Sequence, residues 1–206
     1  MAAGAASGMR QRHKQRTRRA LENAALELFA ERGYDQTSVE AIAERADVSP
    51  RTFFRYFTAK EDVVLDLSAD EPQLFQEAVV ARPAGEGLLV ALREGYADLV
   101  TREGEEARRR MFLRNRVIQA MPLLRGHGAF RVEVEWLDAI AEAVARRLGE
   151  PEPAPEHRLM AAVVMTAIRS AVARWVEGEA REPLEDLARD SFACLSVAMA
   201  ALLEQD

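Results

Sequence analysis

Apolar positions recur at three- and four-residue steps along most of the chain, and the alternating pattern of strands is absent. Ala, Leu, Glu and Arg dominate the sequence, and all four favour helices. The first apolar stripe predicts a helix from about Arg16 to Glu31, ended by Gly33. The pattern as a whole predicts an all-α fold in which a small N-terminal three-helix head precedes a larger helical body.

Residues 37–60 are the most distinctive stretch, because they read as two short helices joined by a tight turn. Thr37 followed by Glu40 fits a capping box at the start of the first helix. Ser49 is a suitable N-cap for the second helix, and Pro50 suits its first position, where a missing N–H has no cost. Both helix starts are therefore specified locally, and the pair is a candidate helix-turn-helix.

The second helix of this pair, about Arg51 to Phe57, places Phe53 and Phe57 four residues apart on an inward face. Its other side chains offer hydrogen-bonding and stacking groups to the outside, as a helix that reads the DNA major groove must. Most helix pairs of this kind touch no DNA, so the pair alone leaves DNA binding open. Two neighbours favour it: a basic segment upstream, and Lys60, whose ammonium can meet a phosphate at the next helix start.

The distribution of charge also favours DNA binding, although the whole chain has a formal net charge of −6. Residues 10–19 hold six basic side chains and no acidic one. Residues 1–66 have a net charge of +1 and contain both lysines of the chain, so the remainder carries −7. A basic arm on a near-neutral head orients a protein on DNA through that head. The alternative is a solvated tail, and in either case we expect residues 1–15 to be flexible without DNA.

The segment from about Arg16 to Asp66 resembles the DNA-binding domain of the tetracycline-repressor (TetR) family of transcription regulators. The runs AALELFAERGYDQTSVEAIAERADVS and RTFFRYFTAKEDVV carry the resemblance. The remainder is similar to the family only in helical character and length. The resemblance implies three parts, which are a flexible basic arm (1–15), a helix-turn-helix DNA-binding domain (16–66) and a ligand-binding and dimerisation domain (67–206).

The resemblance also implies which side chains contact DNA. Thr52 and Phe54 match the groove-facing pair of the recognition helix, and Phe54 suits a thymine methyl or sugar edge because it lacks a hydroxyl. Arg51 and Arg55 can reach guanine edges or phosphates, whereas the remaining positions match contacts to the DNA backbone. The predicted DNA-binding residues are Thr37, Ser38, Arg51, Thr52, Phe54, Arg55, Tyr56 and Lys60.

Two helices predicted at about 156–177 and 183–204 carry apolar residues on more than one face. A helix that is apolar nearly all round is buried on both sides. The core of the body covers one side, and a second copy of the chain is the simplest partner for the other. A central helix buried within a monomer is the alternative. The resemblance implies a homodimer, since family members dimerise through a four-helix bundle of their last two helices.

The body has the composition of a ligand cavity between helices, with large apolar side chains and occasional polar ones. Ordinary core packing is the competing interpretation. Arg169 is a charge within an apolar run, and either a carboxylate of the chain or an acidic ligand head group can pair with it. Arg114 is a second arginine that can receive an acidic or polar end of a ligand. The predicted ligand-binding residues are Tyr96, Met111, Phe112, Asn115, Trp136, Met165 and Arg169.

No catalytic or metal-binding constellation is indicated, so we expect no enzyme, metal or cofactor. His13, His127 and His157 have no i, i+4 partner and no cysteine companion, and we expect them to be solvated. The single Cys194 excludes an internal disulfide framework, and the start lacks the apolar region of a secretory signal, as expected in the cytoplasm. The uncharged stretch 191–203 is too short to span a bilayer, so no membrane partner is expected.

The sequence therefore predicts a homodimeric regulator that binds a palindromic site on double-stranded DNA. A repressor released by a small hydrophobic effector is the leading hypothesis. The DEPQLF break and the ARPAGE turn resemble family members thought to sense acyl-thioester-like lipids, which makes an acyl derivative a candidate effector. The alternatives are a ligand-independent architectural or developmental DNA-binding protein and a helical sensor enzyme. Release of the protein from DNA by a ligand would indicate the repressor. DNA bending without release would indicate the architectural protein, and turnover of a substrate would indicate the enzyme.

Overall fold

The structure is a computed structural model that describes residues 2–65, 71–102, 104–121 and 127–203. Every regular element within these ranges is a helix, which confirms the all-α prediction. The predicted boundaries at residues 1, 66 and 204 lie outside the described part of the chain.

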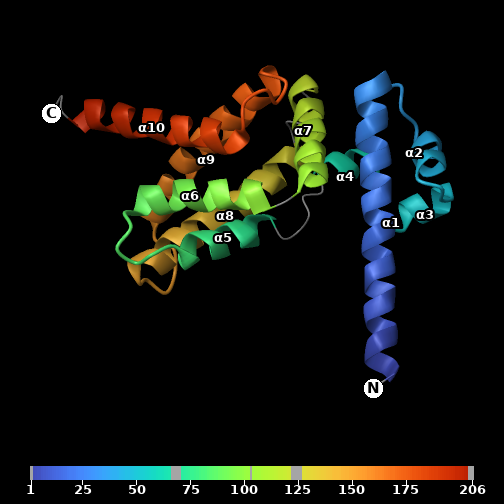
Figure 1. Cartoon of the computed structure of the whole chain (residues 1–206), viewed down its shortest axis with the longest axis horizontal. Coiled ribbons are helices and arrows are strands. Elements are labelled where there is room, and N and C mark those ends of the chain that lie inside the picture. The colour runs from blue at the N-terminus through green and yellow to red at the C-terminus, as the bar shows by residue number, and fades with distance from the viewer. Residues whose placement is uncertain (1, 66–70, 103, 122–126, 204–206) are drawn as a thin grey trace. The chain divides into compact units, whose positions relative to one another are not determined.

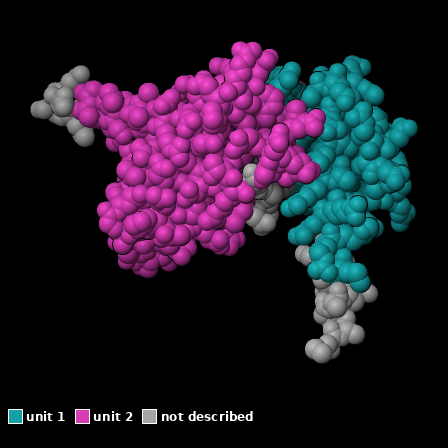
Figure 2. Space-filling model, in the orientation of Figure 1, with its two compact units in different colours: residues 1–66, 116–128 teal, residues 67–115, 129–206 magenta. Residues whose placement is uncertain are grey.

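The chain divides into two compact units, shown in different colours in Figure 2. One unit, which we call the head, contains residues 1–66 together with 116–128. The other, which we call the body, contains residues 67–115 and 129–206. Residues 116–128 were not predicted to belong with the head, because they begin within α7 (Glu105–Ala120), more than 40 residues after the first four helices end.

The head is built on four N-terminal helices, in which α1 packs against α2 and α4, and α2 packs against α3. Their bounds are α1 (Ala2–Arg32), α2 (Val39–Arg45), α3 (Pro50–Phe54) and α4 (Lys60–Leu65). All four helices contribute buried side chains to the head, and Phe57, which follows α3, is buried with them. The buried side chains of the helices include Leu21, Leu26, Leu28, Phe29, Ile42, Phe53 and Val63. The rings of Phe53 and Phe57 lie 5.4 Å apart, which confirms that these residues face inward.

The first helix is longer than predicted. It begins at Ala2 rather than near Arg16, so residues 2–15 continue α1, and its N-terminal half extends past α2 and α3 (Figure 1). Ala, Arg, Gln and Lys make up most of this segment, and these residues have high helix propensities. The apolar stripe starts only at Leu21, which is why the pattern placed the helix start too late. Arg12, Lys14 and Arg16 are exposed on the extension.

The body is a bundle in which α5 packs against α6, while α10 packs against both α6 and α9. The remaining bounds are α5 (Glu71–Ala81), α6 (Leu88–Arg102), α7 (Glu105–Ala120), α8 (His127–Leu148), α9 (Pro155–Glu177) and α10 (Leu184–Leu203). The C-terminal half of α10 projects beyond the other helices of the body (Figure 1). At Gly95 of α6 a Cβ atom would lie 2.6 Å from a methyl of Val79, so glycine permits the close approach of α5.

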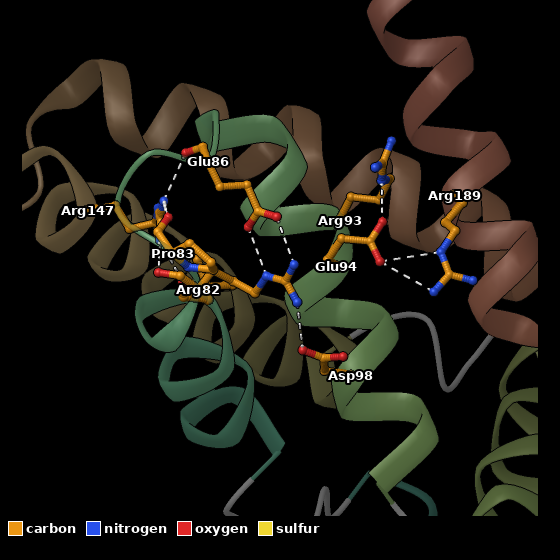
Figure 3. Close-up of polar contacts among 9 residues, drawn as sticks. Arg82, Pro83, Glu86, Arg93, Glu94, Asp98, Arg147 and Arg189 are labelled. Carbon is orange, nitrogen blue, oxygen red and sulfur yellow. Dashed lines mark hydrogen bonds and ion pairs between the residues drawn. The ribbon is translucent and has the colours of Figure 1, made fainter.

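Arg147 of α8 holds the turn between α5 and α6 in place (Figure 3). Its Nη1 donates to the carbonyl oxygens of Val79 (3.2 Å) and Arg82 (3.0 Å), and its Nη2 donates to those of Pro83 (2.9 Å) and Glu86 (2.9 Å). Carbonyl groups at and beyond a helix end have no partner within the helix. One guanidinium therefore joins four carbonyl groups of this turn, of which those of Val79 and Pro83 also accept a backbone N–H.

Glu94 joins α6 to α10 in the same region (Figure 3). It accepts hydrogen bonds from Arg93 Nε (2.7 Å) and from Arg189 Nε (3.4 Å) and Nη2 (3.3 Å). Burial opposes the charge on Glu94, but the hydrogen bonds from Arg93 and Arg189 outweigh burial and hold the pKa of Glu94 below its usual range. This contact links α6 to α10.

We predict that Arg147→Met lowers the free energy of unfolding by about 2 kcal/mol, because four backbone acceptors lose a charged donor at once. Arg146→Met is the matched control, since Arg146 precedes it in the same last turn but is exposed. Urea unfolding of both variants measures the difference. Equal stabilities would show that the four hydrogen bonds contribute nothing beyond the charge near the helix end.

Candidate nucleic-acid interface

The predicted recognition helix is α3, and its start is set by local capping. The Ser49 hydroxyl accepts a hydrogen bond from the Thr52 N–H (3.2 Å), and Pro50 lies in the first turn, so both predictions are confirmed. The helix ends at Phe54, earlier than predicted, with Arg55 as its C-cap. Phe53 is completely buried, whereas Phe54 is 55% exposed. The backbone thus turns one aromatic side chain inward and presents the next to solvent.

The polar side chains predicted to contact DNA lie close together on and just after α3. Arg51 and Arg55 are exposed. The Arg55 guanidinium stacks over the Tyr56 ring at 5.2 Å and donates to the Tyr56 hydroxyl at 3.3 Å. The Thr52 hydroxyl shares a 3.0 Å hydrogen bond with that of Ser49. The helix therefore offers cationic, hydroxyl and aromatic groups on one outer surface, which is the set that reads base edges and phosphates.

The start of α2 differs from the prediction by one residue. Ser38, not Thr37, is the N-cap, and its hydroxyl accepts from the Ala41 N–H at 3.2 Å. The Thr37 hydroxyl instead donates to the Gly33 carbonyl oxygen (2.8 Å) at the end of α1, and Thr37 is only 2% exposed. The predicted capping box of Thr37 with Glu40 is therefore wrong. The Thr37 side chain lies inside the head, while that of Ser38 is exposed.

Lys60 connects the segment before α2 to the start of α4. Its Nζ donates to the carbonyl oxygens of Tyr34 (2.8 Å) and Thr37 (3.1 Å), and it lies 4.1 Å from the centre of the Tyr34 ring. The Tyr34 hydroxyl donates to Glu61 at 3.0 Å. Burial and, next, this contact with Glu61 raise the pKa of Tyr34. An ammonium has three N–H groups, so one remains for the phosphate contact that the resemblance implied.

A groove of about 760 Å³ separates the extension of α1 from the end of the recognition helix. Its lining residues are Met9, His13, Lys14, Arg55 and Tyr56. The basic segment found in the sequence and the recognition helix therefore border one groove within the head. Cationic groups on both sides favour an anionic backbone there.

The predicted ligand-binding residues of the body fall into a packed group and an outlier. Tyr96, Trp136 and Met165 are buried in the core, and the rings of Tyr96 and Trp136 are 6.5 Å apart. Met111, Phe112 and Asn115 of α7 are half-buried: Phe112 packs edge-on against Trp175 at 5.4 Å, and the Asn115 amide donates to the Met111 carbonyl oxygen.

Arg169 is the outlier, and its prediction as a ligand contact requires correction. Its side chain is 57% exposed and forms an ion pair with Glu133 on the surface of the body. The neighbouring apolar residues are buried because they occupy the other face of α9, and sequence proximity to them does not place Arg169 inside.

Arg114 is the arginine that the body does bury, with 6% of its surface exposed. Its Nη1 lies 3.3 Å from Oε1 of Glu71, the first residue of α5, and the Glu71 side chain is also mostly buried. Nothing in the sequence pattern singles out Glu71, because Arg114 is 43 positions away and no local spacing relates the two residues.

The described residues contain no group of three or more His, Cys, Asp or Glu side chains placed to hold a metal ion. His157 differs from the expectation of a solvated side chain: it is 2% exposed, and its Nδ1 accepts a hydrogen bond from the Ala154 N–H at the start of α9. Its role is therefore to cap a helix.

Comparison with known proteins decides the family. Residues 22–67 match the model for bacterial regulatory proteins of the tetR family, and residues 82–200 match that for the MftR C-terminal domain. The chain belongs to the TetR family. The resemblance noted in the first third of the sequence is thus confirmed, and the second match extends it over most of the body.

Relatives of this TetR-family chain are named as regulators. TcmR of Streptomyces glaucescens is 45% identical over 100 residues, which span 48% of this chain and only 44% of that protein. MftR of Mycobacterium tuberculosis, named for the regulation of mycofactocin biosynthesis, is 29% identical over 175 residues, or 82% of this chain and 84% of that one. FadR of Bacillus subtilis in complex with stearoyl-CoA shares the fold, with a TM-score of 0.59, 21% identity, and coverage of 85% of this chain and 96% of that one.

We predict that Lys60→Met and Arg51→Met both weaken DNA binding, but for different reasons. The Lys60 change removes two charged hydrogen bonds inside the head and lowers the free energy of unfolding by about 2 kcal/mol. The Arg51 change removes an exposed charge and leaves stability within about 0.5 kcal/mol. Urea unfolding and operator titration of both variants test this prediction. Equal free energies of unfolding for the two variants would contradict it.

Proposed function

We propose that this chain is a homodimeric transcription repressor that an apolar effector releases from a palindromic operator in the cytoplasm. The observation that carries the proposal is the exposed surface of α3, which presents Phe54 and cationic side chains beside the basic groove of the head. In a TetR-family chain such a surface has one established kind of partner, double-stranded DNA.

We assign Thr52 and Phe54 to base edges and thymine methyls in the major groove, and the arginines of α3 to guanine edges or phosphates. Tyr56, held by Arg55, and the exposed Ser38 are assigned to the DNA backbone. We assign Lys60 to the DNA backbone as well, where its one remaining N–H group can donate to a phosphate. Thr37 is left as a structural residue, since its buried hydroxyl is already bound to Gly33.

Dimerisation through α9 and α10 is supported by the apolar side chains that these helices leave in water. Leu159 is 68% exposed, Val197 71% and Met199 47%. The projecting half of α10 also exposes small residues, which allow two helices to approach closely. A second copy of the chain would bury this surface and hold two heads at a fixed separation, as half-sites about 34–36 Å apart require.

Among the described helices, α9 alone is long and apolar enough to meet the length and composition criteria for a membrane span. Its buried side chains, including Val164, Ile168 and Trp175, belong to the core of the body. A core helix of a folded domain meets the same criteria, and we assign α9 to that class.

An apolar effector is supported by two structural neighbours solved with acyl-CoAs. FadR of Bacillus subtilis was solved with stearoyl-CoA and FadR of Thermus thermophilus with lauroyl-CoA. The effector must prefer the form of the protein that does not fit the operator, because a ligand with equal affinity for both forms shifts nothing. The competing function is a ligand-independent architectural DNA-binding protein.

We predict that a matching effector lowers operator affinity about a hundredfold, which needs about 2.7 kcal/mol of preference for the released form. Acyl-CoAs, fatty acids and planar aromatics are titrated while operator binding and the emission of Trp136 and Trp175 are followed together. Compounds that change tryptophan emission but never operator affinity would show that ligand binding in the body does not control DNA binding. If none binds, the architectural function becomes the better one.

We predict that Val197→Glu converts the dimer to a monomer and reduces operator binding with it, because it places a charge in the surface that the second copy covers. Val90→Glu, at an exposed apolar position on α6, is the control. Sedimentation at micromolar concentration gives the oligomeric state. A wild type that sediments as a monomer would contradict the proposed interface.

A further inference from the structure

The groove of the head has two walls, and only one of them belongs to the helix-turn-helix. Arg55 and Tyr56 form the wall at the end of α3. Met9, His13 and Lys14 form the other wall, on the extension of α1. The two walls border a space of about 760 Å³. A molecule that fills this space therefore contacts the helix-turn-helix and α1 at once.

The α1 wall is held in place by contacts that neighbouring turns of the helix make within the head. Arg18, one turn after Lys14, lies with its guanidinium 5.3 Å from the centre of the Phe57 ring and pairs with Glu22 at 3.3 Å. Leu21, seven residues after Lys14, is completely buried. Residues seven apart lie on the same face of a helix, so an unbroken α1 turns Lys14 toward the end of α3. The groove is therefore a product of the packing of the head.

The lining of the groove combines positive charge with apolar surface. Lys14 and Arg55 are exposed cations, and His13 adds a ring N–H donor. Met9, which is 65% exposed, and the ring of Tyr56 supply the apolar part. None of the described residues that line the groove is acidic. The occupant that matches this lining is an anion with an apolar edge.

A sugar-phosphate strand of DNA has that combination. Its phosphate oxygens accept hydrogen bonds from lysine and arginine, and the carbon atoms of its deoxyribose can contact methionine and tyrosine side chains. In a helix-turn-helix the N-terminal residues of the recognition helix meet the base edges, so Arg55 and Tyr56 at the other end of α3 lie toward a strand. The minor groove, about 6 Å wide, is too narrow for a helix about 10–12 Å across, so α1 meets the DNA backbone from outside.

We propose that the extension of α1 and the end of α3 hold between them the sugar-phosphate strand that flanks each half-site. Lys14 and His13 donate to its phosphates from one side and Arg55 from the other, while Met9 and Tyr56 cover its sugars. Because the extension reaches past α2 and α3 (Figure 1), this contact lies outside the base pairs that α3 reads. The inference rests on the DNA binding of the proposed function and adds a contact that carries no sequence information.

The test uses the full-length protein and an operator that the wild type selects from random-sequence duplexes. The operator is prepared with about ten flanking base pairs, one helical turn, on each side and also without flanks. Lys14→Gln removes a charge from the groove and keeps a residue of high helix propensity. Arg12→Gln is the matched control, since Arg12 is exposed on the same extension but does not line the groove. Titrations over a range of salt concentrations give the affinity and the salt slope.

Lys14→Gln is expected to bind the flanked operator about fivefold more weakly and to reduce the salt slope by about one, because one phosphate contact is lost. On the operator without flanks it should match the wild type within about twofold, and Arg12→Gln should do so on both duplexes. Hydroxyl-radical footprinting reads the burial of individual sugars. The wild type and Arg12→Gln should protect sugars outside each half-site, and Lys14→Gln should protect them less.

Equal affinities of Lys14→Gln and the wild type for the flanked operator overturn the inference. Equal losses in the two variants, an equal loss without flanks, or no protection outside the half-sites overturn it as well. So does a change in the base sequence that Lys14→Gln prefers, because a backbone contact reads no base. In each of these cases the operator is still bound and the proposed repressor stands. A wild type that selects no duplex overturns the proposed function itself.

Discussion

The recognition helix depends on the burial of one phenylalanine. α3 has five residues, and an isolated helix of that length has no stability of its own in water. Phe53, completely buried against Phe57, holds the helix in the head, and the N-cap Ser49 fixes where it starts. Once Phe53 is fixed, helical geometry turns Phe54 and the arginines outward. The DNA-reading surface is therefore a consequence of core packing rather than of helix propensity.

Local signals were sufficient for much of the head. Ser49 and Pro50 specify a helix start through their own backbone chemistry, and Gly33 adopts the positive φ of 84° that ends α1. The cap of α2 was placed one residue early, because two hydroxyl residues are adjacent and only the tertiary contact of Thr37 with Gly33 decides between them. The contacts of Lys60 with Tyr34, 26 positions apart, carry no signature in spacing.

The candidate ligand site shows the same limit more strongly. Trp136 and Met165 were predicted as ligand-binding residues, with core packing as the competing interpretation, and both are buried in the core of the body. Burial of large side chains follows from the helical stripe and does not by itself distinguish the two interpretations. Periodicity could not show which arginine of the body is buried. Arg169, surrounded in sequence by apolar residues, pairs with Glu133 at the surface, whereas Arg114 is buried because Glu71 of a different helix balances its charge. Which charge is inside depends on pairing between helices, and this pairing is set only in the folded bundle.

These constraints also bear on how an effector could act. The head is held together internally by the burial of Phe53 and by the bonds of Lys60 to the segment before α2, so its reading surface has little freedom to change shape alone. The exposed apolar half of α10 is costly in water for a single chain and favourable between two. In the proposed dimer both heads must bind at once, and a small change in their separation removes one from its half-site. The proposed effector would therefore act by favouring another separation, without altering any DNA-contacting residue.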